Sequence, residues 1–581
     1  MTTPRRFLSI LLTALAIAAA RAGQTPQPET SAQSLKRTAD FVIRAGAIHT
    51  MAQGRPTMRS IAIGGGEVLA VGEGSHDLDG FIGSSTQVID DHALTLLPGF
   101  IDTHTHLLFA ASDINDVHVN EAKDIAGFLD LIHKRAAVTP KGAWIRTASD
   151  WNEWNLAEKR MPQASDLDKA TSDHPVLVRR GGHNDVLNTI GMRIVGLTRD
   201  TQTSHGGVIV KDSAGNPTGW LIDAAKGIAE RAFPPPSKEQ RIEELRLASR
   251  DYAAHGITTV RDAFVQEDEL ALFQAARERG VLNVRVRAMV GFGFGPGTPS
   301  QMSPWMDRVA ARISSGDDMF RIWGLKLVLD GGAENGATEE PYVGRPDFKG
   351  ELFWQEDTLA EVISNAARRG LKVGVHAWGD RAVHTLLDVY ERVLKEVPDV
   401  PKGALVLEHG GLAPAKERAR AIKMGIPVTV QHPLLHDLAF GLIQGWGVKR
   451  TAEVFPIREW LDEGALVGAG SDYPVGEYDA MASVWGMVTR QTRAGVLGPE
   501  HAIDVATAIR LYTADAARLI GESNRIGTLE PGRLADLVAY RRDPMSIPVD
   551  ELRSLHPAFT MVGGRIIADQ GKSPVPSSQS K

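Results

Sequence analysis

The sequence predicts an α/β protein built on a (β/α)8 TIM barrel. A small β-sandwich domain from both chain ends and a long insertion after the first barrel strand complete the predicted fold. Three observations predict this fold class. Strands and helices alternate through the middle of the chain, and short hairpin-linked strands occur only near its two ends. About 150 residues separate the first two strands of the alternating part, although one βα unit needs only about 30.

The beginning of the chain is typical of a secretory signal. Arg5 and Arg6 precede an apolar run over residues 7–20, which is too short to span a membrane and is followed by small residues. We therefore expect residues 1–22 to be a cleaved signal peptide and residues 23–38 to be a disordered linker. A periplasmic or secreted location in a bacterium follows, with no stable membrane anchor after cleavage.

Composition excludes several classes of protein and site. The 581 residues contain no cysteine, so neither disulfides nor thiolate metal ligands are available. The net charge is −7 and no basic block follows the N-terminus, so we expect no nucleic-acid partner. We expect a small molecule as the partner, and a homo-oligomer stays open.

Short strands at each end of the chain predict the small β-domain. Neither terminal group is large enough to form a stable sheet alone. We therefore expect one composite domain from residues 39–97 and 525–571, followed by a disordered tail over residues 572–581. Its strands are expected at residues 41–43, 60–63, 68–71, 88–89, 536–540, 559–562 and 565–567.

Residues 98–524 are expected to form the barrel. The insertion, at about residues 107–255, carries strands of its own, and we expect it to lie over one face of the barrel. The eight barrel strands are expected at residues 100–101, 257–263, 284–290, 322–329, 372–376, 404–409, 426–431 and 466–470.

The first barrel strand ends in a pair of histidines. His104 and His106 are two residues apart, so their side chains share one face of the strand. Two imidazoles aimed at one point suit a divalent metal ion. For such a pair taken alone, two ordinary polar residues on a strand are the alternative.

Four further residues of suitable chemistry stand at the ends of later strands: Lys326, His376, His409 and Asp472. The C-terminal ends of barrel strands meet at one mouth, so we expect these residues to converge there with the histidine pair. A lysine ammonium cannot ligate a metal, and Lys326 must first lose a proton, which burial favours. The alternative is a lysine that neutralises Asp330 or a substrate acid.

Four stretches carry recognisable motifs: Val375–Ala382, Glu408-His409, Gly470–Val475 and Thr528–Val538. Together with the first-strand run they resemble the metal-dependent amidohydrolase superfamily, and specifically its amidohydrolase-3 (YtcJ-like) branch. The resemblance extends from about Asp40 to Asp569. The sequence departs from the family's Asp-Gly-Ser pattern at residues 331–334, where it reads Gly-Gly-Ala-Glu.

The resemblance implies a binuclear metal centre, usually of zinc. The ligands it implies are His104, His106 and Asp472 for one ion, His376 and His409 for the other, and Lys326 as a carboxylated bridge. Such ions activate a water molecule and polarise a carbonyl group.

Catalytic and substrate-binding residues are expected around these ligands. Asp472 would take the proton of the attacking water and return it to the leaving nitrogen. His183 resembles a family histidine and is the candidate donor to the oxyanion, with a plain surface histidine as the alternative. Trp378, His183, His432 and Asp330 are the candidate substrate contacts. For Trp378, packing in the core is the alternative.

The leading hypothesis is an exported hydrolase that cleaves a non-peptide C–N bond with a metal-activated water. Its substrate would be an amide, an N-acyl or N-formyl compound, or a carbamate. A second hypothesis keeps the fold but assigns mononuclear deaminase or cyclic-amidase chemistry. A third is a catalytically silent ligand-binding protein, because a fold alone does not establish activity.

Overall fold

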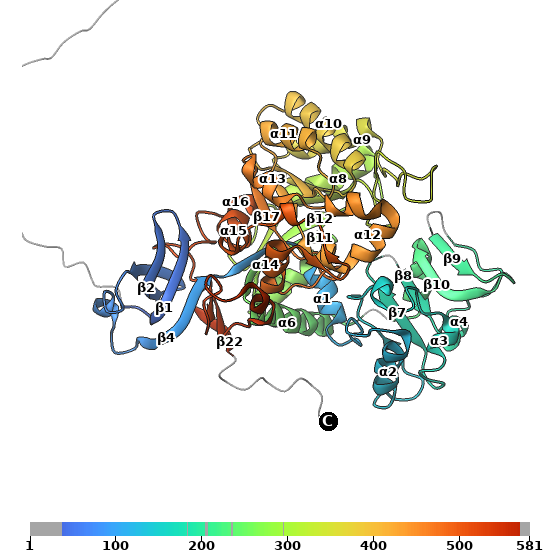
Figure 1. Cartoon of the computed structure of the whole chain (residues 1–581), viewed down its shortest axis with the longest axis horizontal. Helices are drawn as coiled ribbons and strands as arrows, with labels where there is room; N and C mark the ends of the chain where they lie inside the picture. The colour runs from blue at the N-terminus through green and yellow to red at the C-terminus, as the bar shows by residue number, and fades with distance from the viewer. Residues whose placement is uncertain (1–37, 183, 204–206, 234–235, 294, 570–581) are drawn as a thin grey trace, which may run out of the picture. The chain divides into compact units, whose positions relative to one another are not determined.

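The computed structural model describes residues 38–182, 184–203, 207–233, 236–293 and 295–569. Its centre is a sheet of eight parallel strands in the order β17-β16-β15-β14-β13-β12-β11-β5. Three of these strands, β11, β12 and β17, are labelled among the surrounding helices in Figure 1. The strands are β5 (Phe100–Thr105), β11 (Ile257–Val265), β12 (Arg285–Gly291), β13 (Phe320–Val328), β14 (Val373–Ala377), β15 (Leu405–His409), β16 (Val428–Val430) and β17 (Val467–Ala469). Each overlaps a predicted strand, and the predicted (β/α)8 fold is confirmed.

Helices between and after these strands cover the outside of the barrel. They are α1 (Leu107–Asp113), α6 (Lys238–Ala254), α7 (Leu270–Glu278), α8 (Pro299–Ala310), α9 (Glu356–Arg368), α10 (Asp380–Glu396), α11 (Ala415–Met424), α12 (His432–Ala452), α13 (Ile457–Asp462), α14 (Ala480–Thr489), α15 (Val505–Leu511) and α16 (Ala514–Ile520). In α10, buried Val383, Leu386, Leu387 and Tyr390 recur every three to four residues, so one face of the helix packs on the barrel.

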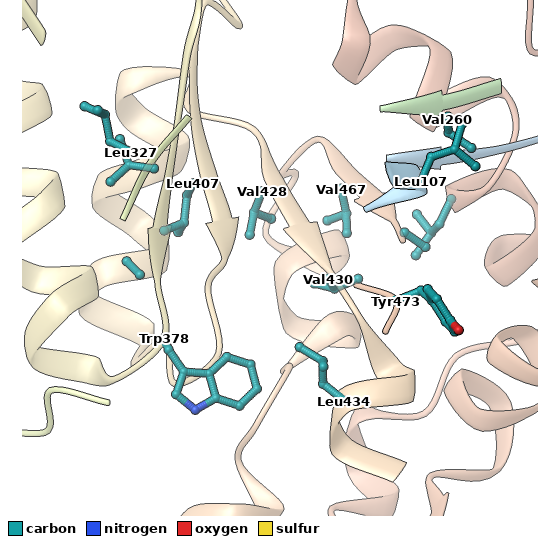
Figure 2. Close-up of a cluster of buried hydrophobic side chains, with 14 of the residues drawn as sticks. Leu107, Val260, Leu327, Trp378, Leu407, Val428, Val430, Leu434, Val467 and Tyr473 are labelled. Carbon is teal, nitrogen blue, oxygen red and sulfur yellow. The ribbon is translucent and has the colours of Figure 1, made fainter. Parts of the chain in front are cut away.

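Apolar side chains from successive strands fill the space under these helices. Figure 2 shows Leu327 of β13, Leu407 of β15, Val428 of β16 and Val467 of β17 in one buried cluster. The strands are buried along nearly their whole length, as parallel strands covered on both faces are. Polar groups on such strands therefore have to find partners inside the barrel.

The barrel closes between β17 and β5, where the histidine pair lies. The Thr103 hydroxyl donates a hydrogen bond to the Ala469 carbonyl (2.8 Å), and the Asp472 N–H donates to the His104 carbonyl (2.7 Å). Gly470 permits this approach, because a Cβ atom there would lie 2.7 Å from the His104 nitrogen. Closure of the barrel thus places Asp472 beside His104.

The two chain ends form one seven-stranded sheet in the order β22-β21-β20-β4-β1-β2-β3. Its strands are β1 (Phe41–Ala52), β2 (Arg55–Gly64), β3 (Glu67–Gly72), β4 (Gln87–Pro98), β20 (Leu537–Tyr540), β21 (Phe559–Val562) and β22 (Arg565–Asp569). The sheet is continuous, whereas a sandwich would have two separate sheets. It curls around its own apolar core, since edge strand β3 bonds to the segment before β20: the Val68 N–H donates to the Arg533 carbonyl (2.8 Å).

A buried ion pair joins this sheet to the barrel. Arg285 of β12 donates to both carboxylate oxygens of Asp536, at 2.7 and 2.8 Å, and the two side chains are only 3% and 4% exposed. Asp536 also accepts the Gly563 N–H at 2.7 Å. Such a bidentate pair fixes orientation as well as distance.

The insertion after β5 has a five-stranded sheet in the order β6-β7-β8-β10-β9. Its elements are α2 (Ile125–Ala136), β6 (Ile145–Arg146), α3 (Ala164–Leu167), β7 (Val176–Arg180), β8 (Asn184–Leu187), α4 (Thr189–Ile194), β9 (Gly207–Lys211), β10 (Pro217–Asp223) and α5 (Gly227–Glu230). Helix α6, inside the expected range of 107–255, instead buries Leu245, Ala248 and Tyr252 in the main barrel cluster. The separate part therefore ends before α6.

The predicted signal peptide, linker and C-terminal tail lie outside the described residues. Within the described part of the chain, no helix combines the length and apolar character needed to cross a membrane.

Replacing Asp536 with Asn should destabilise the protein by about 3–5 kcal/mol, because Arg285 is left buried without its counter-charge. Urea unfolding followed by circular dichroism measures this loss. The matched control is Asp91→Asn, at the exposed pair with Arg541 (35% and 66% exposed), where we expect about 0–1 kcal/mol. Equal losses in the two variants would contradict the structural role of the buried pair.

Candidate metal centre

His104 is held by a buried network at the end of β5. Its Nδ1–H donates to the Glu408 carboxylate (2.7 Å). The Arg261 guanidinium donates to both oxygens of the same carboxylate, at 2.7 and 2.8 Å. All three side chains are almost completely buried. Burial and neighbouring cations, with Lys326 foremost among these, hold the pKa of His104 well below its usual range. His104 therefore stays neutral and turns the lone pair of Nε2 toward the barrel mouth.

His409 is oriented in the same way. Its Nδ1–H donates to the Gln431 side-chain oxygen (2.8 Å), and the Gln431 amide donates to the Thr429 hydroxyl (3.0 Å). Thr429 in turn donates to Glu408 at 2.9 Å, so both histidines depend on one network. Burial lowers the pKa of His409 far below its usual range, which keeps the imidazole in its metal-binding form.

Asp472 completes a group of donors. One potential ligand atom from each of His104, His409 and Asp472 lies within 4.8 Å of the others. The Asp472 carboxylate is 3.0 Å from His106 Nε2 and 3.6 Å from His104 Nε2. Asp472 has a φ of 55° and His409 a φ of 72°, which are strained values for residues other than glycine and often occur at functional sites.

Lys326 of β13 is buried next to His104, with 3.2 Å between its Nζ and His104 Nε2. Burial lowers the pKa of Lys326 to about 8, while Glu408 and Asp472 oppose that shift. The amino group of Lys326 contacts His104, whereas Asp330 is held by backbone N–H groups, which disfavours the alternative of a lysine that neutralises Asp330. A buried amine of lowered pKa is suited to carboxylation.

His376 lies beside His409, with 4.4 Å between the ring centroids. Its Nε2 is 3.3 Å from the Gly331 carbonyl and 3.4 Å from the Asp330 carboxylate. All six predicted ligands thus meet at the mouth. Imidazoles and a carboxylate are the donor set that a zinc-like ion takes. In addition, the buried Nδ1 of His106 has no hydrogen-bond partner among the described residues. The residues fit a divalent metal.

Three of the predicted substrate contacts, Asp330, His432 and Trp378, are buried and have contacts of their own within the fold. Asp330 is fully buried, and its carboxylate accepts the backbone N–H groups of Ala337, Trp378 and Gly379 at 2.8–3.0 Å. Burial raises its pKa to about 7. With its oxygens occupied by backbone donors, Asp330 positions the loops after β13 and β14, and its contact with a substrate stays a prediction.

His432 and Trp378 are buried as well. The His432 ring packs against Gly486 of α14, where a Cβ atom would lie 2.1 Å from Nδ1, and no described contact connects it to the centre. Trp378 is 2% exposed and belongs to the buried cluster in Figure 2. Its ring centroid lies 5.9 Å from that of His409 and 5.4 Å from that of Phe455. Trp378 thus packs from the core side against His409, which is one of the predicted metal ligands. His183 lies outside the described residues.

The sequence analysis missed the network that orients the histidines: Arg261, Glu408, Thr429 and Gln431. A signal was present, since Glu408 stands in the apolar strand β15 and Arg261 in the wholly buried strand β11. A charge inside a buried strand needs a partner. The identity of that partner depends on which strands are neighbours.

A cavity of about 240 Å³ opens between the loops that follow β5, β13 and β16. Because these loops leave the C-terminal ends of their strands, the cavity belongs to the same end of the barrel as the ligands. Its walls include Trp154 from the insertion, Tyr342 from the loop after β13 and Leu438 of α12. Arg180 of the insertion fastens this wall, pairing with Glu334 at 2.7 Å.

Comparison with known proteins places the chain among relatives that share this architecture. A family model described as "Amidohydrolase family" matches residues 87–568. The chain is 27% identical over 543 residues to the N-substituted formamide deformylase of Arthrobacter pascens, covering 90% of this chain and 97% of that protein. It is 25% identical over 540 residues to a protein of Bacillus subtilis strain 168 that is named as an amidohydrolase, YtcJ. The match covers 90% of this chain and 98% of that protein.

A solved structure has the same fold. The crystal structure of an uncharacterized metal-dependent hydrolase from Pyrococcus horikoshii OT3 superimposes with a TM-score of 0.69 at 22% identity, covering 88% of this chain and 99% of that one. The family model spans most of the chain and includes every ligand position described above. The chain belongs to the amidohydrolase family.

Proposed function

We propose that this protein is a metal-dependent hydrolase of a non-peptide C–N bond, with a small N-formyl or N-acyl amine as its substrate. The observation that carries the proposal is the gathering of His104, His409 and Asp472 within 4.8 Å at the barrel mouth, next to a buried lysine. Family membership and the relative named as a formamide deformylase support C–N hydrolysis. Export through a signal peptide is part of the same proposal, on the N-terminal sequence alone.

The residues that would hold metal are those predicted from the sequence. They are His104, His106 and Asp472 for one zinc ion, His376 and His409 for a second, and a carboxylated Lys326 as the bridge. Bound divalent ions supply Lewis acidity toward a carbonyl oxygen and a nucleophile at neutral pH. The neutral state of His104 and His409, set by burial, is the state in which imidazole ligates.

Asp472 is the residue that moves a proton. Its carboxylate faces the mouth beside His106, at 3.0 Å from Nε2, and its backbone is fixed by the hydrogen bond to His104. In the proposed reaction it takes a proton from the attacking water and delivers it to the leaving nitrogen. Hydrolysis of an amide in this way would yield a free amine and a carboxylic acid.

The cavity favours an apolar substituent on the substrate nitrogen. Trp154, Tyr342 and Leu438 offer aromatic and aliphatic surface, and Trp154 rests on α12, where a Cβ atom at Gly441 would lie 3.1 Å from its ring. Burial of an aromatic-sized group is worth about 1.5–3 kcal/mol, enough to select substrates with large substituents.

Removing metal should abolish hydrolysis. We expect a chelator to stop turnover of N-formyl and N-acyl amines, and Zn²⁺ to restore it. Hydrolysis that persists in chelator refutes the proposal.

Asp472→Asn should lower kcat by about 10²–10⁴-fold. Lys326→Ala should lower the metal content of the centre at the barrel mouth below two ions and remove any acceleration of Zn²⁺ reactivation by bicarbonate. One tightly held ion at the barrel mouth, together with a tolerated Lys326→Ala substitution, would favour mononuclear chemistry.

Glu408 is a positioning residue, and Glu408→Gln should weaken metal binding or activity by about 10–100-fold, because His104 loses its charged partner. Competition with a chromogenic chelator measures the affinity directly. The control is Glu361→Gln, an exposed glutamate on α9. Unchanged metal affinity in a folded Glu408→Gln protein would rule out this role.

Trp154→Ala should lower kcat/KM by about 10–100-fold for substrates with a large apolar N-substituent, and leave N-methylformamide unaffected. Steady-state kinetics on both substrates checks this. Trp144→Ala serves as the control within the insertion, since Trp144 packs on Phe233 and does not line the cavity. Equal losses on both substrates would indicate general damage rather than lost substrate contact.

A further inference from the structure

We propose that Glu453, Glu500 and His501 form a second site for a divalent cation of the zinc type, separate from the centre at the barrel mouth. Glu453 directly follows α12, while Glu500 and His501 belong to the short helix η4 (Pro499–His501) that precedes α15. One ligand atom from each residue lies within 4.8 Å of the others. The site shares no residue with the proposed catalytic centre and does not depend on the proposed function.

His501 is oriented as a ligand. Its side chain is 4% exposed, and Nδ1 lies 2.8 Å from both carboxylate oxygens of Glu459 on α13. Donation of Nδ1–H to this carboxylate leaves the lone pair on Nε2. A carboxylate that holds the far nitrogen of an imidazole is the usual second partner of a metal-bound histidine.

The other nitrogen of His501 lacks a partner. Nε2 is buried, and no described residue forms a hydrogen bond with it. Glu453 Oε2 lies 3.6 Å from Nε2, which is too far for a hydrogen bond. Leaving a buried polar atom without a partner is unfavourable, so an occupant at this point would stabilise the folded protein.

The distance between His501 Nε2 and Glu453 Oε2 suits two ligands of one metal ion better than a hydrogen bond between the two side chains. If His501 were a cation bridging Glu459 and Glu453, its Nε2–H would approach Glu453 to about 2.7–2.9 Å. Zinc ligands lie about 2.0–2.2 Å from the ion, so two ligands of a tetrahedral site are roughly 3.4 Å apart. The observed 3.6 Å is near the second value. Water would complete the coordination, because the Glu453 side chain is 58% exposed.

The guanidinium groups near these carboxylates form their hydrogen bonds with backbone carbonyls, although the charge of Arg490 also interacts with Glu459, Glu500 and Glu453. Arg490 is buried nearby, but it donates to the carbonyls of Val454, Phe455 and Leu497 at 2.8–3.1 Å. Arg458 donates to the backbone carbonyls of Glu500 and Ala502. Neither guanidinium forms an ion pair with Glu453, Glu459 or Glu500 among the described residues.

The backbone brings the ligands together through Gly498. This residue has a φ of 58°, and a Cβ atom there would lie 2.2 Å from the Ala452 carbonyl and 2.7 Å from His501 Cδ2. Only glycine lets η4 approach the end of α12 so closely. A cation here would fasten α12 to η4, and through Glu459 it would hold α13 as well. Binding to the folded state alone would then raise the unfolding temperature.

Zinc counting tests the site. Full-length wild type, Glu500→Gln, Glu453→Gln and the control Glu361→Gln are dialysed against equal free Zn²⁺ and analysed by mass spectrometry of the metal. We expect one Zn²⁺ per chain fewer in Glu500→Gln and Glu453→Gln than in wild type and control, with hydrolytic activity unchanged. Equal zinc content in all four proteins would overturn the proposal, whatever the occupancy of the catalytic centre.

Cobalt and thermal unfolding give independent readouts. Co²⁺ titration should show a visible absorption component that is lost in Glu500→Gln, and added Zn²⁺ should raise the unfolding temperature of wild type more than that of Glu500→Gln. His501→Asn should match Glu500→Gln in both measurements. Because Glu500 is exposed, its variant is expected to fold, so identical spectra and identical zinc-induced shifts would also refute the site.

Discussion

The buried pair between Arg261 and Glu408 is the interaction on which the centre depends. Glu408 is fully buried, and Arg261 supplies its counter-charge inside the barrel. The charged carboxylate then fixes the tautomer of His104 directly, and that of His409 through Thr429 and Gln431. One ion pair therefore decides which nitrogen of two histidines can ligate. Removing either charge would leave the other buried and unpaired, which costs about 3–5 kcal/mol.

Burial shifts the pKa values of basic and acidic groups around this pair in opposite directions. It keeps His104 and His409 neutral, lowers the pKa of Lys326 to about 8, and raises that of Asp330 to about 7. In each case the uncharged form is favoured because charge is poorly solvated inside the barrel. Neutral imidazoles and a readily deprotonated amine are what a metal centre needs. The apolar packing of the barrel thus tunes the chemistry as well as the stability.

The mouth of the barrel is built by parts distant in sequence. Closure between β17 and β5 brings Asp472 next to His104, across more than half of the chain. The insertion contributes Trp154, and Arg180 fastens it to the loop after β13 through Glu334. The ligands stand on rigid strand ends, whereas the cavity wall comes from loops. Catalytic chemistry and substrate selection can therefore vary independently in this fold.

The sequence by itself determined the barrel and its eight strands, because buried parallel strands read as short apolar runs between helices. It also determined the six ligand candidates, since reactive residues at strand ends follow from the chain order alone. Only the tertiary structure decided that Arg261 faces Glu408, that Asp330 serves backbone donors and that His432 packs on α14. Local periodicity gives the face on which a side chain lies, but partners depend on strand neighbours and loop paths. The same limit applies to the single curled sheet, whose edge contact at Val68 joins residues more than 460 positions apart.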